Sequence, residues 1–267
     1  MELLLIFCAA FFICAIIIKV IDNTRKKTKY EQNNSNLLIG QASIKGEACF
    51  LKIKRNIINL VTKKNVNTKK SIKIIELFAK YGIKSLWHIT HKNNINSICK
   101  IGILSNYDAH KIKPDFVDIS DSSVQRWRER RDPYYQHTIH EYAPLYINPR
   151  NPMLYIRKHL QNDICIIEVC PSVLEENIYL ISDGNAASKD TKLFQSINSI
   201  KHLPWGILTS DRWYDKPDGK RKMCAEVLIF PNILPKYIKS IHCYSMDTVG
   251  DIRNCGKPVV QTNNLYF

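Results

Sequence analysis

The stretch Ile164-Cys165-Ile166-Ile167-Glu168-Val169 is short and almost continuously apolar, a pattern that predicts a buried β-strand. Residues 177–181, 225–230 and 237–244 show similar apolar runs, and each run predicts another strand. These strands outnumber the helices expected in the second half of the chain and do not alternate regularly with them. The pattern therefore predicts an α+β domain and not a doubly wound parallel sheet.

The region before these strands predicts one strand followed by a short helix. Leu86 to Thr90 is an apolar run that ends in polar residues, and residues 94–100 are followed by Gly102, a residue type that commonly ends helices. The chain contains no internal repeat and no glycine-rich phosphate loop of the Rossmann or Walker A type. A nucleotide site of either type is therefore not expected.

The first 22 residues predict a transmembrane helix. Residues 3–18 are all apolar, and only Lys19 separates them from two further apolar residues, so the run approaches the ~20 residues that span a bilayer. Basic residues follow at 25–27, and the positive-inside rule then predicts a single-pass membrane protein whose C-terminal bulk is cytoplasmic. A buried helix of a soluble domain is the alternative interpretation.

Positive charge is concentrated before residue 85. Residues 1–84 carry 16 Lys and Arg against 5 Asp and Glu, whereas residues 85–267 carry 23 against 19. We interpret residues 23–84 as a basic polar tether with one short amphipathic helix at 71–83, ended by Gly82, and residues 85–267 as one catalytic domain. The formal net charge of +15 favours contact with polyanions, either nucleic acid or an acidic membrane surface.

The nine cysteines include no CxxC pair and no tightly spaced framework, which predicts free thiols in a reducing compartment. His88/His91 and His137/His140 have HxxH spacing, so zinc is an alternative. Neither pair is accompanied by the Cys or Glu spacing of a known zinc motif. We therefore expect no metal site.

Three stretches resemble the DarT family of DNA ADP-ribosyltransferase toxins. They are Trp87-His88-Ile89-Thr90-His91 continuing to Gly102-Ile103-Leu104, Tyr142-Ala143-Pro144-Leu145-Tyr146 continuing to Pro152-Met153-Leu154, and Cys224-Ala225-Glu226-Val227-Leu228. Their order and separation both fit the family, over roughly residues 85–245. The resemblance implies a split β-sheet of the ADP-ribosyltransferase type with flanking helices.

The resemblance also implies a function. NAD would be the ADP-ribose donor, and a thymine or a guanine in single-stranded DNA would be the acceptor, in the toxin of a toxin-antitoxin pair whose macrodomain antitoxin is a separate chain. Two alternatives stay open at this point: an ADP-ribosyltransferase that acts on RNA or protein, and a membrane-tethered nucleic-acid-binding module.

Glu226 and Arg128 are the catalytic residues that the resemblance implies. A carboxylate suits the oxocarbenium-like ribose that forms when the nicotinamide bond breaks. Arg128 would hold the NAD phosphates and assist loss of the proton from the attacking base, with Arg126 as the alternative arginine. Because a guanidinium titrates far above neutrality, electrostatic stabilisation is the easier role for this arginine.

The NAD-binding residues implied by the family lie mostly on the first strand. His88 and Thr90 alternate along it and so face one side, and backbone groups of Ile89 are expected to join them. Ser97 and Ser105 are weaker candidates that could equally be local helix caps.

Two further segments are candidates for a DNA path and for a turn. A mixture of cationic and aromatic side chains suits single-stranded DNA; it comprises the arginines between 126 and 131 with Trp127, Tyr134 and Tyr135. Residues 183–187 predict a turn that enters a helix, with no function assigned.

Overall fold

A computed structural model describes residues 73–113 and 115–267. In this part of the chain, none of the helices is both long and apolar enough to cross a membrane. The predicted membrane segment at 1–22 and most of the predicted tether lie outside the described residues.

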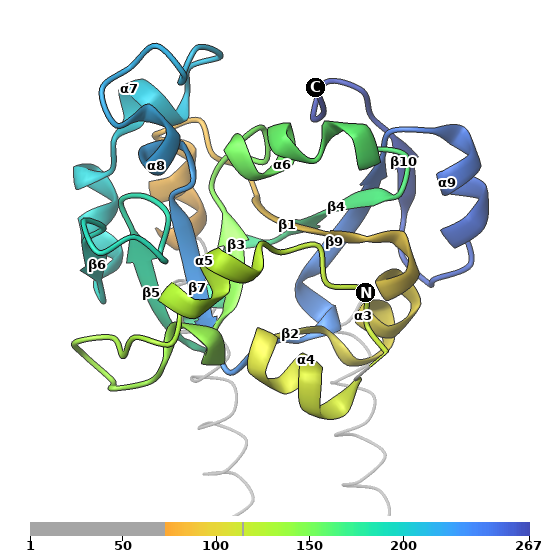
Figure 1. Cartoon of the computed structure of the whole chain (residues 1–267), viewed down its shortest axis with the longest axis horizontal. Coiled ribbons are helices and arrows are strands. Elements are labelled where there is room, and N and C mark those ends of the chain that lie inside the picture. The colour runs from red at the N-terminus through yellow and green to blue at the C-terminus, as the bar shows by residue number, and fades with distance from the viewer. Residues whose placement is uncertain (1–72, 114) are drawn as a thin grey trace, which may run out of the picture. The chain divides into compact units, whose positions relative to one another are not determined.

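The main sheet has eight strands in the order β10-β9-β4-β1-β3-β7-β5-β6, and β2 and β8 form a separate two-stranded sheet (Figure 1). The strands are β1 (Leu86–His91), β2 (Ile103–Leu104), β3 (Ala143–Tyr146), β4 (Ile164–Val169), β5 (Ile178–Ser182), β6 (Leu193–Phe194), β7 (Glu226–Phe230), β8 (Asn232–Ile233), β9 (Ile238–Cys243) and β10 (Val259–Gln261). The four apolar runs are thus confirmed as β4, β5, β7 and β9. All pairings except that of β9 with β10 are antiparallel, so the predicted α+β class is confirmed.

The main sheet is split between β1 and β3. β1 pairs with β4 along its whole length, but it pairs with β3 only at Trp87 opposite Tyr146. Two residues before Tyr146 stands Pro144, which faces the same neighbour and has no N–H to donate to it. The sheet therefore opens beyond this single pair, and the two half-sheets diverge on either side of the gap.

Short helices connect and cover the strands. They are α3 (Ile95–Ile101), α4 (Asn106–Ile112), α5 (Ser122–Trp127), α6 (Pro152–Ile156), α7 (Trp205–Leu208), α8 (Gly219–Met223) and α9 (Met246–Ile252). Single 3-10 turns are η2 (Lys92–Asn94), η3 (Ile139–Glu141), η4 (Lys158–Leu160), η5 (Pro171–Glu175), η6 (Ile197–His202) and η7 (Pro235–Tyr237).

Glycines end two of the predicted helices. Residues 73–79 are helical, Gly82 has a φ of +76°, and the N–H of Ile83 returns to the carbonyl of Phe78, as expected for a glycine-terminated helix. Gly102 follows α3 with a φ of +97°, and a Cβ there would lie 2.2 Å from the carbonyl oxygen of Ile233. Only glycine fits this close approach to β8.

The main core is formed by residues of β1, β4 and β9 in one half-sheet and of β3, β5 and β7 in the other, together with the helices that cover them. The helix at 73–79 contributes Ile74 and Phe78 to the same buried cluster as Leu86 and Ile167. It therefore packs against the domain. The turn at 183–187 is also present, but the helix predicted after it is not, because the chain goes directly through further turns to β6.

Candidate active site

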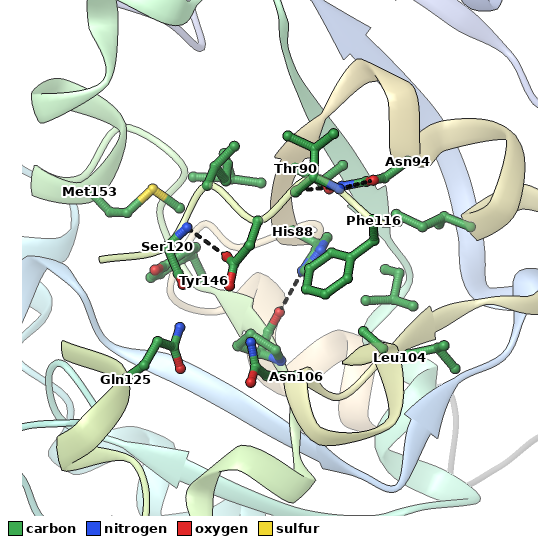
Figure 2. Close-up of a pocket in the computed structure, with 18 of the residues that line it drawn as sticks. His88, Thr90, Asn94, Leu104, Asn106, Phe116, Ser120, Gln125, Tyr146 and Met153 are labelled. Carbon is green, nitrogen blue, oxygen red and sulfur yellow. Dashed lines mark hydrogen bonds between the residues drawn. The ribbon is translucent and has the colours of Figure 1, made fainter. Parts of the chain in front are cut away.

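A cavity of about 900 Å³ lies beside the gap between β1 and β3 (Figure 2). Residues of β1, α3, β3, α6 and α8 line it, together with residues 112–113 and 115–121 before α5 and with Val124, Gln125 and Arg128. The volume lies within the range of sites that enclose small molecules and cofactors, about 300–1,000 Å³. The opening of the sheet is thus the feature that creates the cavity.

His88 is fixed at the gap by the strand on its other side. Its Nδ1 lies 3.0 Å from the carbonyl oxygen of Pro144. Because a carbonyl can only accept, Nδ1 carries the proton, and Nε2 is left as an acceptor. Burial lowers the pKa of His88 despite the hydrogen bond to Pro144, which keeps the ring neutral at pH 7.

Thr90 and Asn94 tie the segment above the cavity to β1. The Asn94 amide donates to Thr90 Oγ1 at 3.0 Å and to the Val117 carbonyl at 2.9 Å, and its oxygen accepts from the Val117 N–H at 2.9 Å (Figure 2). The Thr90 hydroxyl keeps its own proton for a ligand. Asn94 therefore fixes both Thr90, a predicted binding residue, and the segment around Val117 that forms one wall of the cavity.

Arg128 and Glu226 form a bidentate ion pair at the far side of the gap. The two Nη–Oε distances are 2.9 and 3.3 Å, and the side chains are 10% and 1% exposed. Burial lowers the pKa of Arg128, but the charge and hydrogen bonds of Glu226 outweigh this effect and leave it raised. The guanidinium is therefore a permanent cation.

The turn at 183–187 holds the Glu226 carboxylate. The Ala186 N–H donates to Glu226 Oε1 at 3.1 Å, and the Glu226 N–H donates to Ser182 Oγ at 2.8 Å. Arg130 donates to the Ala186 carbonyl at 2.9 Å. A second arginine of the basic run thus supports the turn that orients Glu226.

Arg221 of α8 fixes the same turn from its other side. Its guanidinium donates to Asp183, Thr191 and Asp218, at 2.9, 2.9 and 2.7 Å, and its carbonyl accepts from the Asn185 N–H. A Cβ at Gly184 would lie 2.5 Å from Arg221 Nη1 and 2.9 Å from the Arg221 carbonyl oxygen. The turn therefore has a function that sequence patterns did not assign, which is to position Glu226.

The remaining predicted binding residues differ in where the fold places them. Ile89 and Ser97 line the cavity with His88 and Thr90. Ser105 is fully buried, is not among the residues that line the cavity, and accepts a hydrogen bond from the Asp108 N–H as the N-cap of α4. Of the two alternatives for Ser105, the structure therefore shows the local cap.

Arg126, the alternative arginine, is exposed on α5 and does not line the cavity. Trp127, Tyr134 and Tyr135 are also exposed, by 66%, 42% and 37%. The basic run is thus divided: Arg128 points into the protein toward Glu226, and Arg126 stays on the surface.

Several cavity residues were missed by the sequence analysis. Gln125 lies one helical turn before Arg128 and lines the cavity, and its buried Oε1 has no hydrogen-bond partner (Figure 2). Tyr146 and Arg157 line the cavity as well, and burial, followed by the charge of Glu226, raises the pKa of Tyr146. Only the short interval between Gln125 and Arg128 along one helix could have signalled such a role.

The histidines with HxxH spacing make separate local contacts. His91 Nδ1 accepts from the Asn93 N–H, and the His137 ring stacks on Phe230 with centroids 3.9 Å apart. Among residues 73–113 and 115–267, no three or more His, Cys, Asp and Glu side chains are grouped to hold a metal ion.

The fold and the site together define a mixed α+β protein of the ADP-ribosyltransferase-like class, with a cavity at the split of its sheet. The family model described as "ssDNA thymidine ADP-ribosyltransferase, DarT" matches residues 87–263. This chain belongs to the DarT family.

Characterised relatives and solved structures agree with this assignment. A DNA ADP-ribosyl transferase-DNA ADP-ribosyl glycohydrolase fusion protein of Thermosipho africanus is 29% identical over 193 residues, 69% of this chain and 50% of the relative. This chain thus spans about half the length of that fusion. A DNA ADP-ribosyl transferase of Thermus sp. is 22% identical over 60% of this chain and 81% of the relative.

Among solved structures, Thermosipho africanus DarTG in complex with ADP-ribose has a TM-score of 0.62 at 28% identity, covering 68% of this chain and 51% of that one. Thermus sp. 2.9 DarT in complex with ADP-ribosylated ssDNA has a TM-score of 0.64 at 20% identity, covering 70% and 97%. The second match concerns the fold alone.

Proposed function

We propose that this protein transfers ADP-ribose from NAD to a base, thymine in the first instance, in single-stranded DNA. The observation that carries the proposal is the buried Arg128–Glu226 ion pair across the gap from His88, at a cavity large enough for a dinucleotide. The similarity to DNA ADP-ribosyl transferases of Thermosipho africanus and Thermus sp. supports the same reaction.

The cavity residues fit the chemistry of NAD. The free Nε2 of His88 and the hydroxyl proton of Thr90 suit the nicotinamide amide and its ribose, and Ser97 adds a second hydroxyl. Positive charge for the two phosphates is available from Arg128 and Arg157, both of which line the cavity. The unpaired Gln125 oxygen can accept an N–H from the nicotinamide amide or from the incoming base.

The reaction breaks the bond between C1′ of the ribose and the nicotinamide nitrogen, and nicotinamide leaves with the bonding pair. Glu226 stabilises the positive charge that develops on the ribose. A ring nitrogen of the base then supplies the electron pair for the new bond to C1′, and its proton passes to solvent water. Arg128 cannot accept that proton, because its pKa is raised; it stabilises the negative charge of the base and the phosphates.

Glu226 reaches a substrate only after Arg128 moves. The carboxylate is 1% exposed and is not among the residues that line the cavity, whereas Arg128 is. An anionic ligand in the cavity can pair with the Arg128 guanidinium and so compete with the Glu226 carboxylate for it. Binding of NAD or DNA would thereby release the carboxylate for catalysis.

The DNA strand would approach across the surface of α5. Arg126 and Trp127 are exposed there, with Tyr134 and Tyr135 in the following loop. Cationic and aromatic side chains together suit unpaired nucleotides, because the first bind phosphates and the second stack on bases. The target base must be unstacked to enter the cavity.

Incubation of the full chain with NAD and mixed-sequence single-stranded DNA, followed by mass analysis, tests this function. We expect one added ADP-ribose per modified strand, and none with the Glu226→Gln variant. RNA and protein acceptors are measured in parallel, and labelling of protein alone would contradict the DNA assignment.

We also propose that residues 1–22 anchor the protein in a membrane with the catalytic domain in the cytoplasm, and that a separate macrodomain-type antitoxin removes the mark. The apolar run supports the first proposal, and the glycohydrolase part of the Thermosipho fusion supports the second. Membrane fractionation of the full chain and of a chain that starts at residue 23 tests the anchor: equal recovery in the soluble fraction would exclude it.

A further inference from the structure

Four aromatic rings form a connected surface on the outer side of α6, which we call the aromatic platform. It consists of Tyr214, Trp213, Tyr155 and Phe267, in spatial order. Successive ring centroids are 6.1, 6.1 and 5.2 Å apart, and successive rings are nearly perpendicular. Residues from three separate parts of the chain thus meet in one row.

Two rings of the platform are open to solvent. Tyr214 is 62% exposed and Tyr155 is 44% exposed, whereas Trp213, which lies between them in the row, is buried. Tyr266, next to Phe267, is buried and donates its hydroxyl to the carbonyls of Ile164 and His242. The last ring is therefore held in place by its buried neighbour, close to α6 (Figure 1).

Each of the three partly exposed rings carries a cation. Arg212 lies over Tyr214 at 5.9 Å, Lys158 over Tyr155 at 4.7 Å, and Arg150 over Phe267 at 4.9 Å. Residues 148–162 contain no acidic residue, and residues 211–222 contain five Lys and Arg against three Asp. Of these acids, Asp215 pairs with Arg212 and Asp218 with Arg221, so the platform keeps a positive excess.

The platform adjoins the cavity through two shared elements. Met153 and Ile156 of α6 line the cavity, while Tyr155 between them packs against Trp213 and Phe267. The Trp213 carbonyl packs against Gly219, at the start of α8, and Lys220 and Arg221 of this helix line the cavity. A strand that leaves the cavity over α6 would therefore meet these rings.

From this arrangement we infer that the aromatic platform binds nucleotides of single-stranded DNA that flank the target base. Exposed rings provide stacking faces for unpaired bases, and the cations beside these rings can bind the backbone phosphates. A duplex keeps its base faces covered and cannot use such a surface. The inference rests on the proposed function, and it adds a second DNA contact surface to the one proposed over α5.

Fluorescence anisotropy of labelled oligonucleotides with the full chain tests the platform. The parent, Tyr214→Ala and Arg212→Ala are compared on a long strand that extends past the cavity and on a short strand that only fills it. Because loss of one stacked base weakens binding by roughly 5- to 150-fold, we expect Tyr214→Ala to lower the affinity for the long strand at least about fivefold. Tyr214→Phe, which keeps the ring, should retain the parent affinity.

Lys236→Ala is the matched control for Arg212→Ala. Lys236 also lies over a tyrosine, at 4.9 Å from the Tyr237 ring, and also pairs with an acid, Glu176, but it is remote from the platform in the sequence and in its contacts. We expect the control to bind the long strand like the parent. Equal affinities of Tyr214→Ala, Lys236→Ala and the parent would overturn the inference.

The two proposals fail separately in this design. If Tyr214→Ala binds the long strand more weakly than the parent, but the parent never modifies DNA, the platform stands and the proposed reaction does not. If the parent modifies DNA and Tyr214→Ala binds the long strand normally, the reaction stands and the platform does not.

Discussion

Glu226 on β7 and Glu168 on β4 are strand carboxylates in opposite halves of the split sheet, and each accepts hydrogen bonds from a cation and from at least one other donor. Glu226 is paired with Arg128 and is 1% exposed, whereas Glu168 receives hydrogen bonds from Lys239, Ser240 and Ser85 with its side chain 17% exposed. Only the first pair lies beside the cavity. We therefore expect the Arg128–Glu226 pair to serve catalysis and the Lys239–Glu168 pair to serve stability, because the sheet is open beside the first pair alone of these two.

The largest expected difference is in transfer activity. Glu226→Gln removes the charge that stabilises the developing cation, and we expect ADP-ribose transfer to fall about 1,000-fold, a loss typical of removing a preorganised electrostatic group. Glu168→Gln, the matched change on β4, should keep transfer within about twofold of the parent. Mass analysis of modified DNA measures both, and equal losses would contradict the division between the half-sheets.

Substitution of the cation beside each carboxylate, Arg128 beside Glu226 and Lys239 beside Glu168, tests the same difference between the half-sheets. Arg128→Lys keeps the charge but loses the fork of donors that would hold the NAD phosphates and the deprotonated base, so we expect transfer to fall about 100-fold. Lys239→Arg, over Glu168, should leave transfer unchanged. Rates at saturating NAD decide the matter, and an unaffected Arg128→Lys enzyme would show that the fork geometry is not required.

A substitution of Arg221 tests whether the turn at 183–187 positions Glu226, because it leaves Glu226 itself unchanged. Arg221→Lys cannot reproduce the contacts to Asp183, Thr191 and Asp218, so the turn carrying Ala186 should become less well ordered. We expect about a tenfold lower kcat, because small misplacements of a reacting group are costly. The KM for DNA is the accompanying readout, and a change in KM alone would argue against a positioning role.

We expect Glu168 to contribute to the free energy of unfolding, and we expect this contribution to depend on pH. Burial raises the pKa of Glu168, but hydrogen bonds from Lys239, Ser240 and Ser85 outweigh it and lower the pKa from 4.5 to about 2. The stabilisation is therefore present above pH 4.5 and is lost as the pH falls toward 2. At pH 7, Glu168→Gln should lower the free energy of unfolding by about 2 kcal/mol.

Denaturant unfolding at a series of pH values measures this effect. The difference between parent and Glu168→Gln should shrink steadily below pH 4.5. A difference that does not change with pH would mean that the charge of Glu168 contributes nothing.

The smallest effect concerns Ser105. Ser105→Ala removes the N-cap of α4 and should lower the free energy of unfolding by about 1 kcal/mol. The KM for NAD should change less than about twofold, since the side chain does not line the cavity. A large rise in that KM with unchanged stability would instead support the binding role that the family resemblance suggested.

Much of the local structure could be predicted because it depends on neighbours in the sequence. The apolar run 164–169 forms β4 with the predicted bounds, and the glycines at 82 and 102 end the predicted helices. The turn at 183–187 was also predicted, but the helix after it was wrong, since small and polar residues suit successive turns as well as a first helical turn. Its contact with Glu226 could not be foreseen, because 40 residues separate Ala186 from that glutamate.

The sequence by itself determined β1, β4, β5, β7 and β9, the helices ended by Gly82 and Gly102, and the residue types available for catalysis, because hydrophobic periodicity and glycine act over a few residues. Tertiary structure alone decided that Arg128 meets Glu226, 98 residues away, while Arg126 stays exposed. It also decided that the sheet opens beyond Tyr146 into a cavity. Both outcomes depend on how distant strands pack, and the free energy of that packing is not encoded in any single stretch of the chain.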